Sequence, residues 1–358
     1  MIAVSKRLAA AAMVLLILTG RANGEETVTR FAAGEDEGAE LVIASVTDID
    51  FMQPLIAAFQ QANSDVSVTY IEDTSNSLDA SVSRACADRG FFADLVISSS
   101  IAQQVRLVNS GCAREIGGPV LSSLPAWAQW RGELIGLTYE PAVMVYNKAA
   151  FAADGPPRSR FDLIDLMRQS GALNGRIATY DIEESGVGYL FAFQDSTEAS
   201  TWGRLIEGFG RNSVATFCCS SEVIDRVADG RAYVGYNVLG SYARSRAAKD
   251  DRIGVVLPTD YTLVLARAGY IPREARNAGA ARAFLELALS ERGRTILDGE
   301  THLLTPLSGP AALAGLGGGE EPAFRPIPLS PALLVSLDQA KRARFLSQWR
   351  KSVTLPTP

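Results

Sequence analysis

The stretch "ADLVISSSIAQQVRLVNSG", residues 93 to 111, predicts a strand that stops at three serines and passes directly into a helix. The run "ADLVIS" is nearly all apolar, as in a strand buried on both faces, and a helix-like segment begins at Ile101. One helix N-cap needs one hydroxyl, whereas Ser98, Ser99 and Ser100 offer three. We therefore expect these serines, and the unpaired N–H groups behind them, to face a ligand.

Strand-like and helix-like segments also alternate upstream of this stretch. "LVIASV" (41–46) precedes "FMQPLIAAFQQAN" (51–63), and "VSVTYI" (66–71) precedes "SLDASVSRACADR" (77–89). This alternation predicts an α/β fold in which a mainly parallel sheet is flanked by helices on both faces.

The pattern restarts downstream and predicts a second α/β unit at about 142–254. Two apolar runs flank it, "GLTYEPAVMVYN" (136–147) and "IGVVLPTDYTLVLA" (253–266). If the first run carries the chain into the second unit and the other returns it, two hinge crossovers leave a cleft between two lobes. We expect lobe 1 at 40–138 and 259–350, and lobe 2 at 142–254. The elements expected in lobe 2 are helices around 161–170, 186–209 and 221–229 and the strands "RIATY" and "AYVGY".

The first residues indicate export. Lys6 and Arg7 precede an uncharged run shorter than the ~20 residues that span a bilayer, and small residues follow it, so residues 1–24 are predicted to be a cleaved signal peptide. Residues 25–39 are acidic and aperiodic, which predicts a flexible leader. We expect a periplasmic monomer that does not insert into the membrane after cleavage.

The charge excludes two classes of partner. The formal net charge is -6, and the signal carries three basic residues and no acidic ones, so the mature chain has a net charge of -9. An acidic chain is a poor ligand for nucleic acid or for an anionic membrane surface.

Four cysteines and one histidine limit the chemistry further. Cys86 lies in a helix-like stretch and Cys112 just beyond the next one, and we expect their Cα atoms within the ~7 Å that a disulfide permits. Adjacent Cys218 and Cys219 fit neither a zinc spacing nor a C-x-x-C pair; two buried free thiols are expected, with a vicinal disulfide as the alternative. His302 is the single histidine, so a histidine metal site or a Ser-His-Asp triad has almost nothing to draw on.

Polar residues also gather at other predicted strand ends. In open parallel sheets, ligands bind beyond the carboxyl ends of strands. Thr47 and Asp48 follow the first strand, and Ser185, Gly186 and Val187 lead into a helix. An anion at these helix starts would be stabilised by free N–H donors and the helix dipole. For any single junction, capping alone is the alternative.

With these junctions in place, the chain resembles a type II periplasmic solute-binding protein of ABC importers, in the branch of the ferric-iron and sugar-phosphate binders. The resemblance covers roughly 40–350 and implies a two-lobed fold, each lobe a mainly parallel sheet flanked by helices, that closes over a small ligand. The segments that carry it are "ADLVISSSIAQQVRLVNSG", "LTYEPAVMVYNK", "ATYDIEESGVGYLF", "GYNVLGSYA" and "VVLPTDYTLVLARAGYIP".

The residues that follow the late strand of lobe 2 distinguish an iron-binding site from an anion-binding site. Ferric-binding relatives carry two consecutive tyrosines after this strand, whereas the comparable place here is near Gly240 and Ser241, and Tyr236 and Tyr242 stand six positions apart. Hard oxygen ligands for iron are therefore not visibly brought together. We interpret Asn237, Gly240 and Ser241 as amide, backbone and hydroxyl donors to an anion and include Tyr236 as a ligand candidate; a core role for Tyr236 is the alternative.

Three hinge residues complete the candidate site. Tyr139 and Glu140 lie in the first crossover and Asp260 beside the second, where hinge segments line the back of a cleft. Glu140 could instead fix the hinge, because a carboxylate beside an anion costs energy unless a base offsets it. Of Arg244 and Arg246, at most one is expected to point inward, because residues two apart on a helix face different ways.

The expected function is a non-enzymatic receptor for a small organic anion, carboxylated or phosphorylated, without cofactor or metal. It would pass the solute to an ABC permease or report it to a sensor kinase of the inner membrane. A ferric-ion receptor of the same fold is the alternative. A secreted serine hydrolase is disfavoured because the chain has no G-x-S-x-G elbow.

Overall fold

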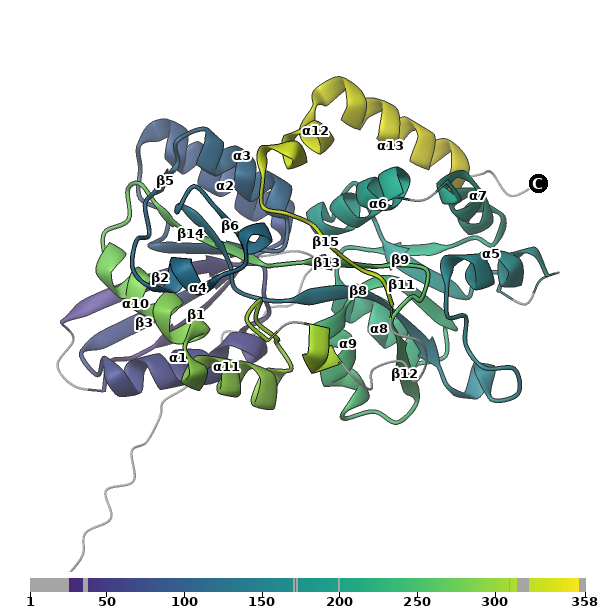
Figure 1. The fold of residues 1–358 in the computed structure, drawn as a ribbon, viewed down its shortest axis with the longest axis horizontal. Helices are drawn as coiled ribbons and strands as arrows, with labels where there is room; N and C mark the ends of the chain where they lie inside the picture. The colour runs from purple at the N-terminus through teal and green to yellow at the C-terminus, as the bar shows by residue number, and fades with distance from the viewer. Residues whose placement is uncertain are drawn as a thin grey trace, which may run out of the picture.

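Two β-sheets, each covered by helices, lie side by side (Figure 1). The computed structural model describes residues 26–34, 38–169, 171, 173–198, 200–308, 310–313 and 322–353. The predicted signal peptide, residues 1–24, lies outside the described residues. Among those described, no helix has the length and apolar character needed to cross a membrane.

The first sheet has the strand order β1-β3-β2-β4-β14-β7-β6, with β5 paired to β14. Strands β3, β2 and β4 are parallel, as the apolar runs predict, whereas β14 returns antiparallel beside β4. The strands are β1 (Thr27–Phe31), β2 (Ala39–Ser45), β3 (Val66–Glu72), β4 (Leu95–Ser98), β5 (Ala113–Arg114), β6 (Gln129–Trp130), β7 (Leu134–Gly136) and β14 (Ala268–Pro272). The helical segments between them are α1 (Ile49–Ala62), α2 (Ser75–Asp88), α3 (Ile101–Asn109), α4 (Val120–Ser123), η1 (Ala126–Ala128), α10 (Ala278–Leu289), α11 (Glu291–Ile296) and η3 (Leu297–Thr301).

The second sheet has the order β10-β9-β11-β8-β13-β15, with β12 paired to β8. Strands β10, β9 and β11 are parallel, and β8 runs antiparallel to β11 and β13. Its strands are β8 (Glu140–Asn147), β9 (Ile177–Tyr180), β10 (Ala215–Phe217), β11 (Val234–Leu239), β12 (Ile253–Val256), β13 (Thr262–Leu265) and β15 (Phe324–Pro326). Its helical segments are η2 (Ala149–Phe151), α5 (Arg160–Arg168), α6 (Gly186–Glu198), α7 (Trp202–Arg211), α8 (Ser220–Ala228) and α9 (Gly240–Ala247).

The α/β class is confirmed, and both sheets are mixed, because β14 and β1 run antiparallel to their neighbours in the first sheet and β8 does so in the second. The chain leaves the first sheet after β7 and enters β8, and it leaves β13 and enters β14, which are the two expected passages. It passes a third time to reach β15. Sheet membership therefore differs from the predicted lobe limits, because β13 and β15 belong to the second sheet although residues 259–350 were assigned to lobe 1.

The helices at residues 331–353 lie partly on the first unit and partly on the second. The last described helical segments are η4 (Pro310–Leu313), η5 (Pro331–Leu333), α12 (Leu334–Leu337) and α13 (Gln339–Val353). Helix α12 packs against α3 of the first unit and α13 against α7 of the second. In Figure 1 this yellow segment runs over both units. The buried side chains of Phe345 and Trp349 stack on Trp202.

Two local predictions are wrong. Within the expected flexible leader 25–39, Thr27–Phe31 form β1, because they find an antiparallel partner in β3. The expectation of two buried free thiols fails because Cys218 and Cys219 form a vicinal disulfide in a partly exposed turn between β10 and α8. The Cys86–Cys112 pairing is confirmed, with Cα atoms 5.5 Å apart.

Candidate functional site

Three helices begin where the two units meet. The backbone N of Gly186, at the start of α6, donates to Ser75 Oγ at the start of α2, at 2.9 Å. A Cβ atom placed on Gly186 would lie only 2.1 Å from Ser100 Oγ, at the start of α3. Asn76 Nδ2 donates to the Glu184 carbonyl at 2.7 Å across the same boundary. The fold thus brings two predicted junctions, the Ser98–Ser100 turn and the Ser185–Gly186 helix start, into direct contact.

The hydroxyls at this contact differ in how they are used. Ser98 Oγ accepts from the Ser100 backbone N at 3.1 Å, and Ser185 Oγ accepts from Gly188 N at 3.2 Å, so both cap local backbone. Ser100 Oγ is buried and has no hydrogen-bond partner among the described residues. Ser99, which lies between Ser98 and Ser100 in the sequence, is also buried. The side chain of Val187 belongs to the apolar core.

A buried ion pair joins the two hinge passages next to these helix starts. Arg267 Nε lies 3.0 Å from Glu140 Oε1, and both side chains are almost fully buried. Ser241 donates to the same carboxylate through its backbone N at 3.2 Å and its hydroxyl at 2.9 Å. Arg267 Nη1 donates to Thr47 Oγ1, whereas Nη2 is buried without a partner among the described residues.

The surroundings of Arg267 keep it charged. Burial by itself lowers the pKa of this guanidinium, but the Glu140 carboxylate and the Tyr242 phenol more than offset it, so the pKa lies above its ordinary value. The Arg267 guanidinium carbon lies 5.2 Å from the centre of the Tyr242 ring. Arg267 neutralises the charge of Glu140. The predicted cost of placing this carboxylate beside an anion is therefore offset by a base.

Tyr242 and Asp48 form a second bridge between the units. The Tyr242 hydroxyl donates to Asp48 Oδ1 at 2.6 Å and accepts from the Asp48 backbone N at 3.2 Å. Burial raises the pKa of Tyr242 well above its ordinary value, and the Asp48 charge adds to this against the opposing effect of Arg267. The phenol is therefore held as a neutral donor.

Three other predicted ligand residues belong to a network centred on Arg160, which begins α5 and is fully buried. Arg160 donates to the Tyr236 hydroxyl at 2.7 Å, to Asp195 at 3.0 Å and to Asp260 at 3.2 Å. Tyr236 and Asn237 each donate to Asp195 Oδ2 at 2.7 Å. The polar groups of Tyr236 and Asp260 are thus engaged within the second unit, whereas Asn237 Oδ1 remains buried without a partner among the described residues.

The two remaining predicted residues occupy tight positions at the hinge. The Tyr139 hydroxyl is buried without a partner among the described residues, and burial raises its pKa to about 12. A Cβ atom on Gly240 would lie 2.6 Å from Pro141 Cγ, so glycine allows α9 to begin against the first crossover.

Arg267, the buried cation that pairs with Glu140, was not identified from the sequence. Arg267 was a lone arginine in the apolar run "TLVLARAGYIP", a pattern that could have indicated a buried and paired charge. Neither Arg244 nor Arg246, the two arginines of α9, takes the place of Arg267. Arg244 pairs with Asp298 at 3.3 Å, and Arg246 pairs with Asp225 at 2.6 Å.

The comparisons with known proteins agree with this architecture. Residues 41–300 match the model of the family described as bacterial extracellular solute-binding protein. The chain is similar to the substrate-binding protein of an ABC transporter from Agrobacterium tumefaciens, with 35% identity, a TM-score of 0.84, and coverage of 93% of this chain and 100% of that chain. No match was found among curated proteins.

Two more distant structures show the fold alone. AfuA from Actinobacillus pleuropneumoniae, solved with fructose-6-phosphate, has 18% identity and a TM-score of 0.69, covering 89% of this chain and 100% of its own. Iron-bound HitA from Pseudomonas aeruginosa has 16% identity and a TM-score of 0.64, covering 88% of this chain and 99% of its own. Both have the type II periplasmic binding protein fold.

Proposed function

We infer the ligand class of this chain from the premise that it belongs to the bacterial extracellular solute-binding protein family, whose members are not enzymes. The chain serves as the solute-binding protein of an ABC importer and delivers its solute to a permease. We propose that the solute is a small organic anion bearing a carboxylate or phosphate, bound between the two units. Export to the periplasm through the predicted signal peptide belongs to the same proposal.

The observation that carries the anion proposal is a set of buried donors at the boundary between the units. Helices α2, α3 and α6 begin there, and a helix dipole favours an anion near the N-terminus, although the Gly186 and Gly188 N–H groups of α6 already donate to Ser75 Oγ and Ser185 Oγ. Ser100 Oγ and Arg267 Nη2 are buried there without partners among the described residues. A buried polar group without a partner costs ~1–3 kcal/mol, a cost that an anionic acceptor would remove.

The tyrosines favour an organic anion over iron. Tyr236 and Tyr242 donate to different carboxylates, Asp195 and Asp48, in separate networks. Burial raises the pKa of both phenols, whereas an iron site needs phenolates. Ferric ion is therefore the competing ligand to be tested against organic anions.

The test is a thermal-shift screen of organic acids, sugar phosphates and ferric citrate. A ligand at a hundred times its Kd adds ~2.7 kcal/mol to the free energy of unfolding. We expect a carboxylate or phosphate to stabilise the protein and ferric ion to leave it unchanged. Stabilisation by ferric citrate with a visible phenolate absorption band, without an effect of any organic anion at matched citrate, would overturn the proposal.

Ser100→Ala then tests the location of the site. A hydrogen bond to a charged acceptor is worth ~1.5–3 kcal/mol, so the affinity for the ligand found in the screen should fall roughly ten- to a hundredfold. The free energy of unfolding without ligand should not fall, because Ser100 Oγ has no protein partner to lose among the described residues, and removing an unpartnered buried hydroxyl relieves its cost. Ser122→Ala, at an exposed hydroxyl on α4, is the control. Equal affinities of the two variants would place the ligand elsewhere.

A further inference from the structure

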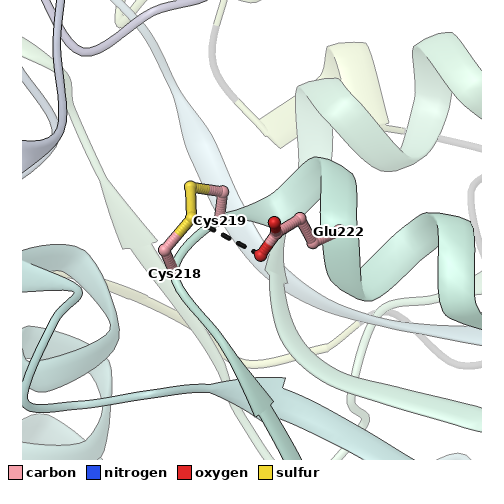
Figure 2. Close-up of side chains that lie close together, drawn as sticks. All are labelled: Cys218, Cys219 and Glu222. Atoms are coloured by element: carbon pink, nitrogen blue, oxygen red, sulfur yellow. Dashed lines mark hydrogen bonds between the residues drawn. A yellow bond between two sulfur atoms is a disulfide. The ribbon is translucent and has the colours of Figure 1, made fainter. Parts of the chain in front are cut away.

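The vicinal disulfide forms a small cluster with an acidic side chain of the next helix. Cys218 follows β10, Cys219 is the N-cap residue of α8, and Glu222 lies in the first turn of that helix. Figure 2 shows the Glu222 carboxylate turned toward the two sulfur atoms. Cys218 Sγ lies 3.5 Å from Glu222 Oε2, and the two sulfurs and a carboxylate oxygen all lie within 4.8 Å of one another.

We propose that Cys218, Cys219 and Glu222 form a redox-gated binding site for a thiophilic divalent cation such as Zn²⁺ or Cd²⁺. In the disulfide form the sulfurs are bonded to each other and cannot act as thiolate ligands. When the bond is reduced, the same side chains offer two thiolates and one carboxylate to a single ion. The oxidation state of one covalent bond thereby determines whether the site exists.

The geometry suits such an ion. In tetrahedral zinc sites Zn–S is about 2.3 Å and Zn–O about 2.0–2.2 Å, which places sulfur and oxygen ligands of one ion about 3.5 Å apart. The present sulfur-to-oxygen distance of 3.5 Å already has this value. The two sulfurs must separate to about 3.8 Å by the same geometry, and Cys219 Sγ starts within 4.8 Å of the carboxylate oxygen. The cysteines are partly exposed and the glutamate is exposed, so a water molecule can complete the coordination.

The position of the cluster also favours thiolates. The N-terminus of α8 lies directly behind Cys219, and helix N-termini lower thiol pKa values. Cys219 has no side-chain cap hydrogen bond to lose, so metal binding does not compete with helix capping. This site lies apart from the Cys86–Cys112 bridge, which supplies an internal comparison.

The chemical step balances with a named reductant. A trialkylphosphine breaks the S–S bond, its phosphorus takes the oxygen of one water molecule as phosphine oxide, and the two protons of that water go to the sulfurs. Metal binding then releases both thiol protons to solvent as the two thiolates coordinate. In the cell a thiol reductant would supply the two electrons and become a disulfide itself.

The experiment uses the full mature chain and Cd²⁺ as the probe. The protein is reduced with a trialkylphosphine, desalted without oxygen, and its thiols are mapped by alkylation before titration. Bound cadmium per chain and the ultraviolet thiolate-to-cadmium absorption are then measured. We expect one tightly bound Cd²⁺ in the reduced protein and at least hundredfold weaker binding in the oxidised protein.

Matched variants identify the ligands. Cys218→Ser/Cys219→Ser keeps the Cys86–Cys112 pair and should lose the site, so any binding that remains belongs to that pair. Glu222→Gln should weaken binding at least about tenfold, since even outer-shell changes cost about 10–100-fold. Glu207→Gln, an exposed glutamate on α7, should change nothing. Circular dichroism establishes that each variant is folded.

Three results would each overturn the proposal. The first is equal cadmium affinity of the reduced wild type and the double serine variant, and the second is equal affinity of Glu222→Gln and Glu207→Gln. The third is a Cys218–Cys219 bond that the phosphine leaves intact in the folded protein, because the site could then not open. Competition by Zn²⁺ for the bound Cd²⁺ extends a positive result to a physiological ion.

Discussion

At the scale of single residues, Tyr236, a predicted ligand residue, lies in a buried hydrogen-bond network. Its hydroxyl accepts from Arg160 and donates to Asp195, each at 2.7 Å, and all three side chains are buried. Tyr236→Phe leaves both partners short of one hydrogen bond in a buried site. We expect the free energy of unfolding to fall by about 1–3 kcal/mol in urea denaturation.

The matched control for this variant is Tyr146→Phe in β8, a half-buried tyrosine outside the Arg160 network. It should change the free energy of unfolding by less than about 0.5 kcal/mol. A loss of equal size in both variants would contradict a specific role for the network. A neutral effect of Tyr236→Phe together with lost ligand binding would return Tyr236 to the ligand site.

The same residues show where sequence reasoning stops. Apolar runs report burial, so the sequence located the strands and the polar residues at their ends, such as Ser98–Ser100 and Thr47. It did not indicate which polar side chains pair across long stretches of the chain, because neither spacing nor composition encodes those contacts. Thr47 meets Arg267 from 220 positions away, and Arg160 meets Asp260 from 100. The roles of the predicted ligand residues stay a prediction until a ligand is bound.

At the scale of elements, the boundary between the units depends on how closely α6 approaches α3. Gly186→Ala places a Cβ atom 2.1 Å from Ser100 Oγ and 3.0 Å from Ser75 Oγ, so the helix starts must move apart. Overpacking of this kind costs about 1–3 kcal/mol, and we expect that loss in urea denaturation. Combining it with Ser100→Gly should restore part of the stability, because the nearest atom is then gone.

Gly203→Ala provides the control within α7, the helix that follows. A Cβ atom there meets nothing within 4 Å, and alanine replaces glycine in a helix with a gain of about 0.5–1 kcal/mol. The two substitutions should therefore have opposite signs. Stabilisation by Gly186→Ala would mean that α6 and α3 are not held in contact in solution.

Element boundaries were predictable where local chemistry fixes them. Strand "RIATY" corresponds to β9, and the helix expected at 221–229 corresponds to α8. The break at Asp338 between α12 and α13 has no proline or glycine, and its local signal is Asp338 itself, which caps α13 by accepting from Lys341 N at 2.9 Å. It arises because α12 packs on the first unit and α13 on the second.

At the scale of the whole molecule, one ion pair connects both hinge passages. Glu140 begins β8 at the first passage and Arg267 precedes β14 at the second, 127 positions later, with Nε and Oε1 3.0 Å apart. Thr47 of the first unit and Ser241 of the second bond to this pair. The pair therefore joins the two passages to both units.

Glu140→Gln should consequently affect both stability and shape. Removing one partner leaves a buried guanidinium uncompensated, which costs about 3–5 kcal/mol of unfolding free energy. Because the lost bonds join the two passages, small-angle scattering should also show a larger radius of gyration for the ligand-free protein. Glu207→Gln breaks an exposed pair with Arg211, with side chains 55% and 70% exposed, and should cost at most about 1 kcal/mol without a change of radius. If Glu140→Gln lowered stability but left the radius equal to that of Glu207→Gln, the pair would stabilise the hinge without setting the distance between the units.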